Sequence, residues 1–223
     1  MLSADAIAAN AREVEARIVA ACTRARRSPN EVTLIAVTKT FPAEAVTAAI
    51  AAGIANVGEN RVQEARDKQP LVAGKVHWHL IGHLQSNKAK DAVRLFDMIQ
   101  SVDSIELAEK LARAADAAAK QQEILLQVNI GREPQKSGID PAEVAGAVKQ
   151  LVAYPSLRLR GLMAIPPAGE AEETRRFFRE LRMMRDAEGM EQLSMGMSED
   201  YEVAIEEGST MVRVGRAIFG SRG

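Results

Sequence analysis

The feature that most constrains the fold of this chain is a regular alternation between short apolar runs and longer amphipathic runs. The short runs are β-branched and have the length of buried strands, whereas the runs between them have the apolar spacing of helices. We count eight strand-like runs, each followed by a helical run. Alternation of this kind predicts a parallel sheet, and eight units predict an α/β fold of one class, the closed (β/α)8 or TIM barrel. An open, doubly wound sheet is the alternative.

The predicted elements follow one another without a linker or a low-complexity segment, so we expect one domain over residues 1–223. The expected strands are 31–39, 54–58, 75–82, 96–102, 123–130, 157–165, 192–196 and 210–215. The expected helices are 42–53, 60–69, 86–95, 104–121, 140–154, 170–189, 198–208 and a stub at 216–220. A further N-terminal helix, capped by Ser3, lies outside this count. We expect it to cover the barrel wall near the short last helix.

The charge and cysteine content exclude several classes of protein. The chain has 29 basic and 30 acidic side chains and a net charge of −1, so we expect no nucleic-acid partner. The single cysteine, Cys22, permits no internal disulfide, which fits a reducing compartment; we expect it to be a small buried apolar residue. The first residues lack the pattern of a signal peptide, and no apolar run is long enough for a membrane span. We therefore expect a cytoplasmic protein.

A barrel gathers its functional residues at the ends of its strands, on the loops that lead into helices. Ten residues of the chain have such positions. They are Lys39, Asn60, His83, Gln85, Asn129, Met163, Ser194, Ser198, Arg213 and Gly215. We expect the polar members of this set to converge on one mouth of the barrel.

Lys39 carries the clearest chemistry of this set. It ends an apolar strand, where burial would disfavour the ammonium and lower its pKa. An amine deprotonated in this way can attack a carbonyl and form a Schiff base. The alternative is a surface lysine in the loop before Pro42, and spacing alone leaves both interpretations open.

The loops after the last two strands suggest a phosphate site. Ser198 has the position of a helix N-cap, and Gly215 opens the last helical stub, where free N–H groups and close backbone approach favour an anion. Arg213 could add positive charge, whereas Glu199 and Asp200 act against an anion. Ordinary helix capping is the alternative for either loop. A strand-end lysine facing a phosphate site suggests a phosphorylated aldehyde, and pyridoxal 5′-phosphate (PLP) is the obvious candidate.

Long motifs identify a known family. They are AVTKTFP (36–42), GENRVQE (58–64), WHLIGHLQSNK (78–88), QVNIGREPQKSG (127–138), GLMAI (161–165) and LSMGMSEDYEVAIEEGSTMVRVGRAIFG (193–220). Through them the chain resembles the pyridoxal phosphate homeostasis proteins, the YggS/PROSC family, which is related to the N-terminal barrel of alanine racemase. The resemblance spans nearly the whole chain, in order, and implies a single barrel that holds PLP.

The resemblance also implies roles for individual residues. Lys39 matches the family's Schiff-base lysine, which would hold PLP as an internal aldimine. Ser198, Gly215 and Arg216 match positions that hold the phosphate, the last two through backbone N–H groups. Arg213 matches an arginine at the cofactor, and its contact with the phosphate or with the ring nitrogen stays open. Asn60 and Met163 match the pocket wall.

Binding of PLP does not by itself imply catalysis. A racemase needs a base on each face of the α-carbon, and alanine racemase supplies one from a tyrosine on a further domain, beyond the point where this sequence stops. The tyrosines here, Tyr154 and Tyr201, fall in predicted helices, Tyr201 near the phosphate loop. We therefore expect a monomeric PLP carrier in vitamin B6 homeostasis, with apo PLP-dependent enzymes as its partners. A weak PLP-dependent amino-acid racemase is the alternative.

A third possibility, a metal-dependent hydrolase, rests on the three histidines of residues 76–85. His77 and His79 share one face of the predicted strand, but His83 lies on the loop beyond it, and catalytic zinc usually takes three protein ligands. We expect no metal site. His77 is expected to be structural, whereas His83 and Gln85 stand at the mouth, where either could touch the cofactor.

Overall fold

The computed structural model describes residues 2–220, so Met1 and residues 221–223 of the predicted 1–223 domain lie outside the described residues. Eight parallel strands form a closed barrel in the order β1 to β8, and β8 pairs with β1 to complete it. The strands are β1 (Thr33–Val37), β2 (Asn56–Glu59), β3 (His77–Leu80), β4 (Met98–Val102), β5 (Gln122–Val128), β6 (Leu157–Ala164), β7 (Gln192–Met197) and β8 (Met211–Val214). The predicted TIM barrel is thus confirmed, and the alternative of an open sheet is wrong because no edge separates β1 from β8.

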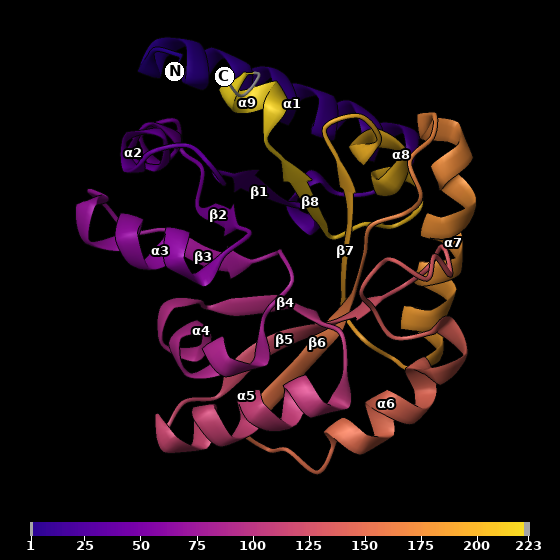
Figure 1. Cartoon of the computed structure of the whole chain (residues 1–223). Coiled ribbons are helices and arrows are strands. Elements are labelled where there is room, and N and C mark those ends of the chain that lie inside the picture. Colours follow the sequence, from indigo (N-terminus) through magenta and orange to yellow (C-terminus); the bar gives the residue numbers. More distant parts are fainter. Residues whose placement is uncertain (1, 221–223) are drawn as a thin grey trace.

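Helices surround this barrel (Figure 1). The α-helices are α1 (Ala4–Arg24), α2 (Ala43–Ala51), α3 (Val62–Lys68), α4 (Ala89–Leu95), α5 (Ile105–Ala117), α6 (Val144–Leu151), α7 (Ala171–Ala187), α8 (Tyr201–Glu206) and α9 (Arg216–Phe219). Short 3-10 turns are η1 (Pro29–Glu31), η2 (Gln69–Leu71), η3 (Ser86–Lys88) and η4 (Pro141–Glu143). The runs predicted as uniform helices at 86–95 and 140–154 therefore each begin with a 3-10 turn, as helix N-termini often do.

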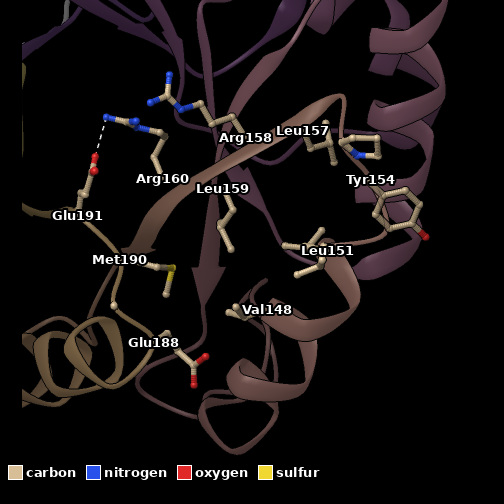
Figure 2. Close-up of a pocket in the computed structure, with 13 residues that line it drawn as sticks. Val148, Leu151, Tyr154, Leu157, Arg158, Leu159, Arg160, Glu188, Met190 and Glu191 are labelled. Carbon is tan, nitrogen blue, oxygen red and sulfur yellow. Dashed lines mark ion pairs between the residues drawn. The ribbon is translucent and has the colours of Figure 1, made fainter.

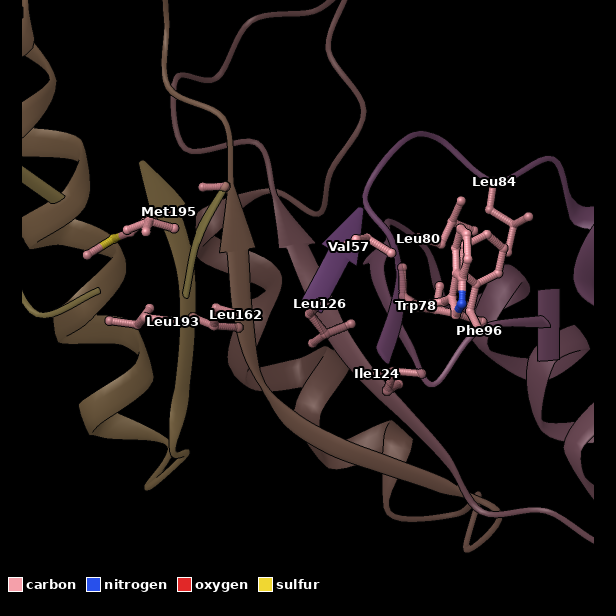
Figure 3. Packing of buried hydrophobic residues seen from close by; sticks show 14 of the residues in the cluster. Val57, Trp78, Leu80, Leu84, Phe96, Ile124, Leu126, Leu162, Leu193 and Met195 are labelled. Carbon is pink, nitrogen blue, oxygen red and sulfur yellow. The ribbon is translucent and has the colours of Figure 1, made fainter. Parts of the chain in front are cut away.

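Two apolar layers hold the barrel together, because successive side chains of a strand point to opposite faces. In β5, Ile124 and Leu126 point outward into the layer between sheet and helices, whereas Leu125 points into the barrel. Figure 3 shows the outer layer, in which Trp78 and Phe96 lie among aliphatic side chains from several strands. The inner layer contains Ile35, Met98, Leu125, Met163 and Met211. Polar side chains share the interior with this small apolar cluster.

Helix α1 covers the barrel where the last unit is short. Its buried residues include Ile7, Val14 and Cys22, and it packs against α2, α8 and α9. The Asn10 side-chain amide donates a hydrogen bond of 2.9 Å to the Ile218 carbonyl of α9. In Figure 1, α1 runs along one side of the molecule beside α9. The prediction that this helix covers the wall near the last stub is confirmed, and so is the burial of Cys22.

One predicted helix start is wrong. Ser198 was expected to cap the helix after β7, but α8 begins at Tyr201, with Asp200 at the N-cap position. Residues 198–200 instead form a turn, in which the Asp200 carboxylate accepts a hydrogen bond of 2.7 Å from the Met197 N–H. Asp200 thus takes the N-cap position expected of Ser198, although its side chain makes no capping bond to α8, and the Ser198 hydroxyl lies beside the next loop.

Candidate functional site

A cavity of about 870 Å³ lies at the carboxyl ends of the strands. Six of the seven residues predicted for a cofactor site line it. They are Lys39, Asn60, Ser198, Arg213, Gly215 and Arg216. The seventh, Met163, is fully buried in the apolar cluster inside the barrel and is not among the described residues that line the cavity.

Lys39 follows β1, and side chains of the α3 segment hold the peptide groups on both sides of it. The Lys68 ammonium donates a hydrogen bond of 2.7 Å to the Thr38 carbonyl. One residue beyond Lys39, the Thr40 N–H donates 3.1 Å to the Glu64 carboxylate. Thr40 has a φ of 67°, a left-handed conformation that costs a non-glycine residue free energy. These contacts fix the backbone from which the Lys39 side chain reaches the cavity.

A buried ion pair lies directly behind this lysine. Glu59 ends β2 with no exposed surface, and its Oε1 lies 2.7 Å from the Lys68 ammonium and accepts a hydrogen bond of 2.7 Å from the Thr38 hydroxyl. Its Oε2 has no partner among the described residues. Burial raises the pKa of Glu59 to about 7, although the bonds from Lys68 and Thr38 act in the opposite direction. Glu59 therefore titrates near neutral pH.

The loops after β7 and β8 meet at the opposite wall. The Gly215 N–H donates a hydrogen bond of 3.4 Å to the Ser198 hydroxyl. A side chain at Gly215 would approach Val37 of β1 to 3.3 Å, so the absence of one lets this loop lie close to the strand that leads to Lys39. Arg216 opens α9, and its exposed guanidinium pairs with Glu199 at 3.1 Å. This pair draws the Arg216 side chain toward Glu199, while the Arg216 backbone forms the start of α9.

Arg213 is the buried cation of the site. Its Nη1 donates 2.6 Å to the Ser194 hydroxyl and its Nη2 donates 2.9 Å to the Ala164 carbonyl. Burial lowers the pKa of Arg213 to about 10, and the nearby Asp200 carboxylate acts in the opposite direction. The guanidinium therefore stays charged at neutral pH, and its hydrogen bonds go to neutral groups rather than to a carboxylate.

The three histidines are in three different environments. His77 is exposed at the start of β3, with its Nδ1 3.9 Å from Asp97. His79 lies inside the barrel, where its ring nitrogens face Asn56 and Gln100. His83 lies at the mouth, lines the cavity, and has its Nδ1 2.9 Å from Asp103. Gln85 is exposed and is not among the described lining residues. Within residues 2–220 no group of three or more His, Cys, Asp and Glu side chains is placed to hold a metal ion.

Sequence reasoning missed several residues of the cavity. The loop after β6 contributes residues 165–169, and Gln127, Lys136 and Ser137 also line the wall. Lys136 forms an ion pair with Glu133 and donates 3.1 Å to the Pro166 carbonyl, which joins the loops after β5 and β6. The position of these loops after strands indicates that they lie at the mouth of the barrel. Loop residues have no periodicity, however, so the sequence does not show which of their side chains point into the cavity.

A second hollow, of about 480 Å³, lies at the other end of the barrel (Figure 2). It is formed by the end of α6, the start of β6 and the turn before β7, where Arg160 pairs with Glu191 at 2.8 Å. Tyr154 lines this hollow. Tyr201 is buried with the Arg17 guanidinium 5.2 Å from its ring centre, and so faces α1. Both tyrosines of the chain lie in the described part, and neither lines the cavity at the strand ends.

The fold and this site correspond to a known class of barrel. The sequence model of the alanine racemase N-terminal domain matches residues 2–223. A pyridoxal phosphate homeostasis protein from Pseudomonas aeruginosa is 46% identical over 97% of this chain and 96% of its own length. One from Escherichia coli K12 is 44% identical, with 97% of each chain covered.

A solved structure agrees with these relatives. PipY of Synechococcus elongatus PCC7942, determined with PLP bound, is 41% identical, with a TM-score of 0.81 and coverage of 91% of this chain and all of that one. The chain therefore belongs to the pyridoxal phosphate homeostasis protein family, within the class of barrels that form the N-terminal domain of alanine racemase.

Proposed function

We propose that this chain binds pyridoxal 5′-phosphate and acts in intracellular vitamin B6 homeostasis, as a single barrel domain of residues 1–223. One observation carries the proposal: Lys39, Arg213 and the Ser198–Gly215–Arg216 loops line the same cavity. The names of its relatives and the PLP bound in PipY support the same ligand.

The chemistry of the lining fits such a ligand. PLP supplies an aldehyde for an amine and a phosphate for hydrogen-bond donors. Lys39 is the amine that would form a Schiff base with it. The hydroxyl of Ser198 and the backbone N–H groups of Gly215 and Arg216 are the donors proposed for the phosphate. Arg213 faces neutral partners, so an anionic ligand would supply the negative charge that its own hydrogen bonds do not. Asn60 is proposed as part of the wall, whereas Met163, which the resemblance also places there, lies in the apolar cluster inside the barrel.

We propose that the chain carries or buffers the cofactor without turnover. Racemisation requires a second acid–base group opposite the lysine, and among the described residues the tyrosines point to other parts of the molecule. On this view the chain holds a reactive aldehyde and releases it to apo PLP-dependent enzymes. We also propose a cytoplasmic monomer, a state that sedimentation of the purified protein would test. No helix in the described part of the chain is long and apolar enough to cross a membrane.

The direct test is the visible absorbance of the purified protein mixed with PLP. We expect a Schiff-base band in the wild type that is absent in Lys39→Ala, because an alanine has no amine to react. The matched control is Lys136→Ala, which removes the other cavity lysine of the described residues and should leave the band in place. A band that persists in Lys39→Ala and disappears in Lys136→Ala would show that Lys136, and not Lys39, forms the Schiff base.

The same preparation tests the absence of turnover. We expect no conversion of L-alanine or L-serine to the D-isomer over hours at a concentration of protein that gives a clear band. Robust rates that disappear in Lys39→Ala would establish a racemase instead and would overturn the carrier role.

A further inference from the structure

A line of hydrogen bonds crosses the interior of the barrel from the cavity toward its opposite end. Arg213 donates to the Ser194 hydroxyl at 2.6 Å, and this hydroxyl donates to Gln100 Oε1 at 2.6 Å. The Gln100 amide nitrogen lies 3.1 Å from His79 Nδ1, and His79 Nε2 lies 3.0 Å from Asn56 Oδ1. We call these residues (Arg213, Ser194, Gln100, His79 and Asn56) the interior chain. They come from β8, β7, β4, β3 and β2.

The direction of every bond in the interior chain follows from its first member. A guanidinium can only donate, so the Ser194 oxygen must accept, and its single proton must then go to Gln100 Oε1. With its oxygen occupied, Gln100 presents its amide N–H to His79 Nδ1, which must accept. The imidazole proton is therefore on Nε2, from which it donates to Asn56 Oδ1. The reverse orientation would leave the Ser194 proton without an acceptor.

Burial makes each of these bonds costly to break. Ser194 and Gln100 have no exposed surface, Arg213 is 3% exposed and His79 4% exposed. A buried polar group has given up its hydrogen bonds to water, so the loss of its partner in the protein costs free energy that nothing replaces. None of Ser194, Gln100 and His79 is among the described residues that line the cavity, and the hydrogen bond between Ser194 and Arg213 connects them to it.

The Ala164 carbonyl holds the second nitrogen of the guanidinium, and this bond alone would allow Arg213 to turn about it. The bond to Ser194 is the second fixed point, and Ser194 is oriented in turn by Gln100 and His79. We propose that Ser194, Gln100 and His79 are positioning residues for the ligand site, which hold Arg213 in one orientation toward the bound molecule. This inference rests on the proposed function, because it requires a ligand at Arg213.

The test is a set of binding measurements with PLP, read by its absorbance change. Gln100→Met keeps the volume of the side chain and removes both hydrogen bonds, and Ser194→Ala removes the acceptor for Arg213. We expect each to raise the dissociation constant about tenfold, the size expected of one misplaced hydrogen bond to a charged group. Leu125→Met, another conservative change inside the barrel, is the matched control and should bind like the wild type.

A mutant cycle separates positioning from general loosening of the barrel. If the interior chain acts through Arg213, the Ser194→Ala/Gln100→Met double variant should bind no more weakly than either single variant. In an Arg213→Lys background, Gln100→Met should have no further effect. His79→Gln, which again offers an acceptor and a donor, should bind more tightly than His79→Leu, and thermal unfolding of each variant reports whether it is folded.

The possible outcomes are distinct. Failure of the wild type to bind PLP would reject the proposed function and this inference with it. Binding by the wild type, with unchanged dissociation constants in Gln100→Met and Ser194→Ala, would reject the inference alone. Heteronuclear NMR of the wild type supplies a readout that needs no ligand: the proton of His79 should be on Nε2, and its presence on Nδ1 would contradict the chain of donors.

Discussion

At the scale of single residues, the barrel contains two buried ionisable side chains whose pKa values are displaced in opposite directions. Burial raises the pKa of Glu59 to about 7 and lowers the pKa of His79 to about 4. Both shifts favour the neutral form, as expected for groups removed from water. Each shift should make the free energy of unfolding depend on pH, because the two side chains have ordinary pKa values in the unfolded chain.

For Glu59, the folded protein retains a proton that the unfolded chain loses between the ordinary pKa of 4.5 and the folded value of about 7. The free energy of unfolding contributed by this residue should fall as pH rises through that window, by roughly 3 kcal/mol at most. Denaturant unfolding of the wild type and Glu59→Gln across this range measures the difference. A difference that does not change with pH would contradict the raised pKa.

For His79, the sign is reversed. The unfolded chain takes up a proton below pH 6.5, whereas the folded protein does so only near pH 4. The contribution of His79 to the free energy of unfolding should therefore decrease as pH falls through that window, again by roughly 3 kcal/mol at most. Comparison of the wild type with His79→Gln tests this, and His77→Gln, at the exposed end of β3, is the control. Equal pH profiles in all three proteins would show that burial does not shift His79.

At the scale of elements, glycine positions determine how closely neighbouring strands and loops approach. A Cβ at Gly161 would lie 1.9 Å from the Gln192 carbonyl, at the start of the β6–β7 pairing. A Cβ at Gly82 would lie 2.4 Å from the Asn60 carbonyl, between two loops of the cavity. Backbone rather than a flexible side chain occupies the space in both cases, so the chain cannot adjust locally.

Gly161→Ala should therefore lower the free energy of unfolding by about 1–3 kcal/mol, the range for overpacked sites. Gly146, within α6, has nothing within 4 Å of an added Cβ. Gly146→Ala should raise stability by about 0.5–1 kcal/mol, because alanine favours a helix interior. Urea unfolding of both variants tests the pair, and a stabilised Gly161→Ala would refute the close approach of β6 to β7.

At the scale of the whole molecule, α1 completes the helical layer where the eighth unit provides only α9. Ile7 of this helix is 1% exposed, whereas Val19 on its outer face is 48% exposed. If α1 is part of one cooperative fold, Ile7→Ala should cost about 2–4 kcal/mol of global stability, and Val19→Ala should change it by less than about 0.5 kcal/mol. Unfolding followed by both tryptophan fluorescence and circular dichroism would show one transition. A separate early transition in Ile7→Ala would mean that α1 unfolds independently.

Much of this architecture could be predicted from the sequence because it depends on local periodicity. The eight strands, the short last helix and the outer helix α1 follow from patterns within about 20 neighbouring residues. Lys39, Ser198 and Gly215 were predicted as parts of one site because the carboxyl ends of barrel strands meet at one mouth.

The remaining features depend on contacts between distant residues. Ser198 was expected at a helix N-cap, but residues 198–200 form a turn and α8 begins only at Tyr201. The Asp200 carboxylate closes this turn by accepting from the Met197 N–H, and the contact exists only in the folded loop. The interior chain joins residues 56, 79, 100, 194 and 213, whose spacing has no regular pattern. Their inward direction follows from strand register, which a single sequence does not specify.

Because β8 pairs with β1, the order of the eight units along the chain could be permuted without changing the barrel. The described ends also meet, since Leu2 lies against Gly220, and Figure 1 places α1 beside α9. In a closed ring of eight units no unit is structurally first, so a circularly permuted chain could begin at another unit and form the same ring. A gene that joined these ends and opened a turn at the far end of the barrel would encode the same cavity in a different order of motifs.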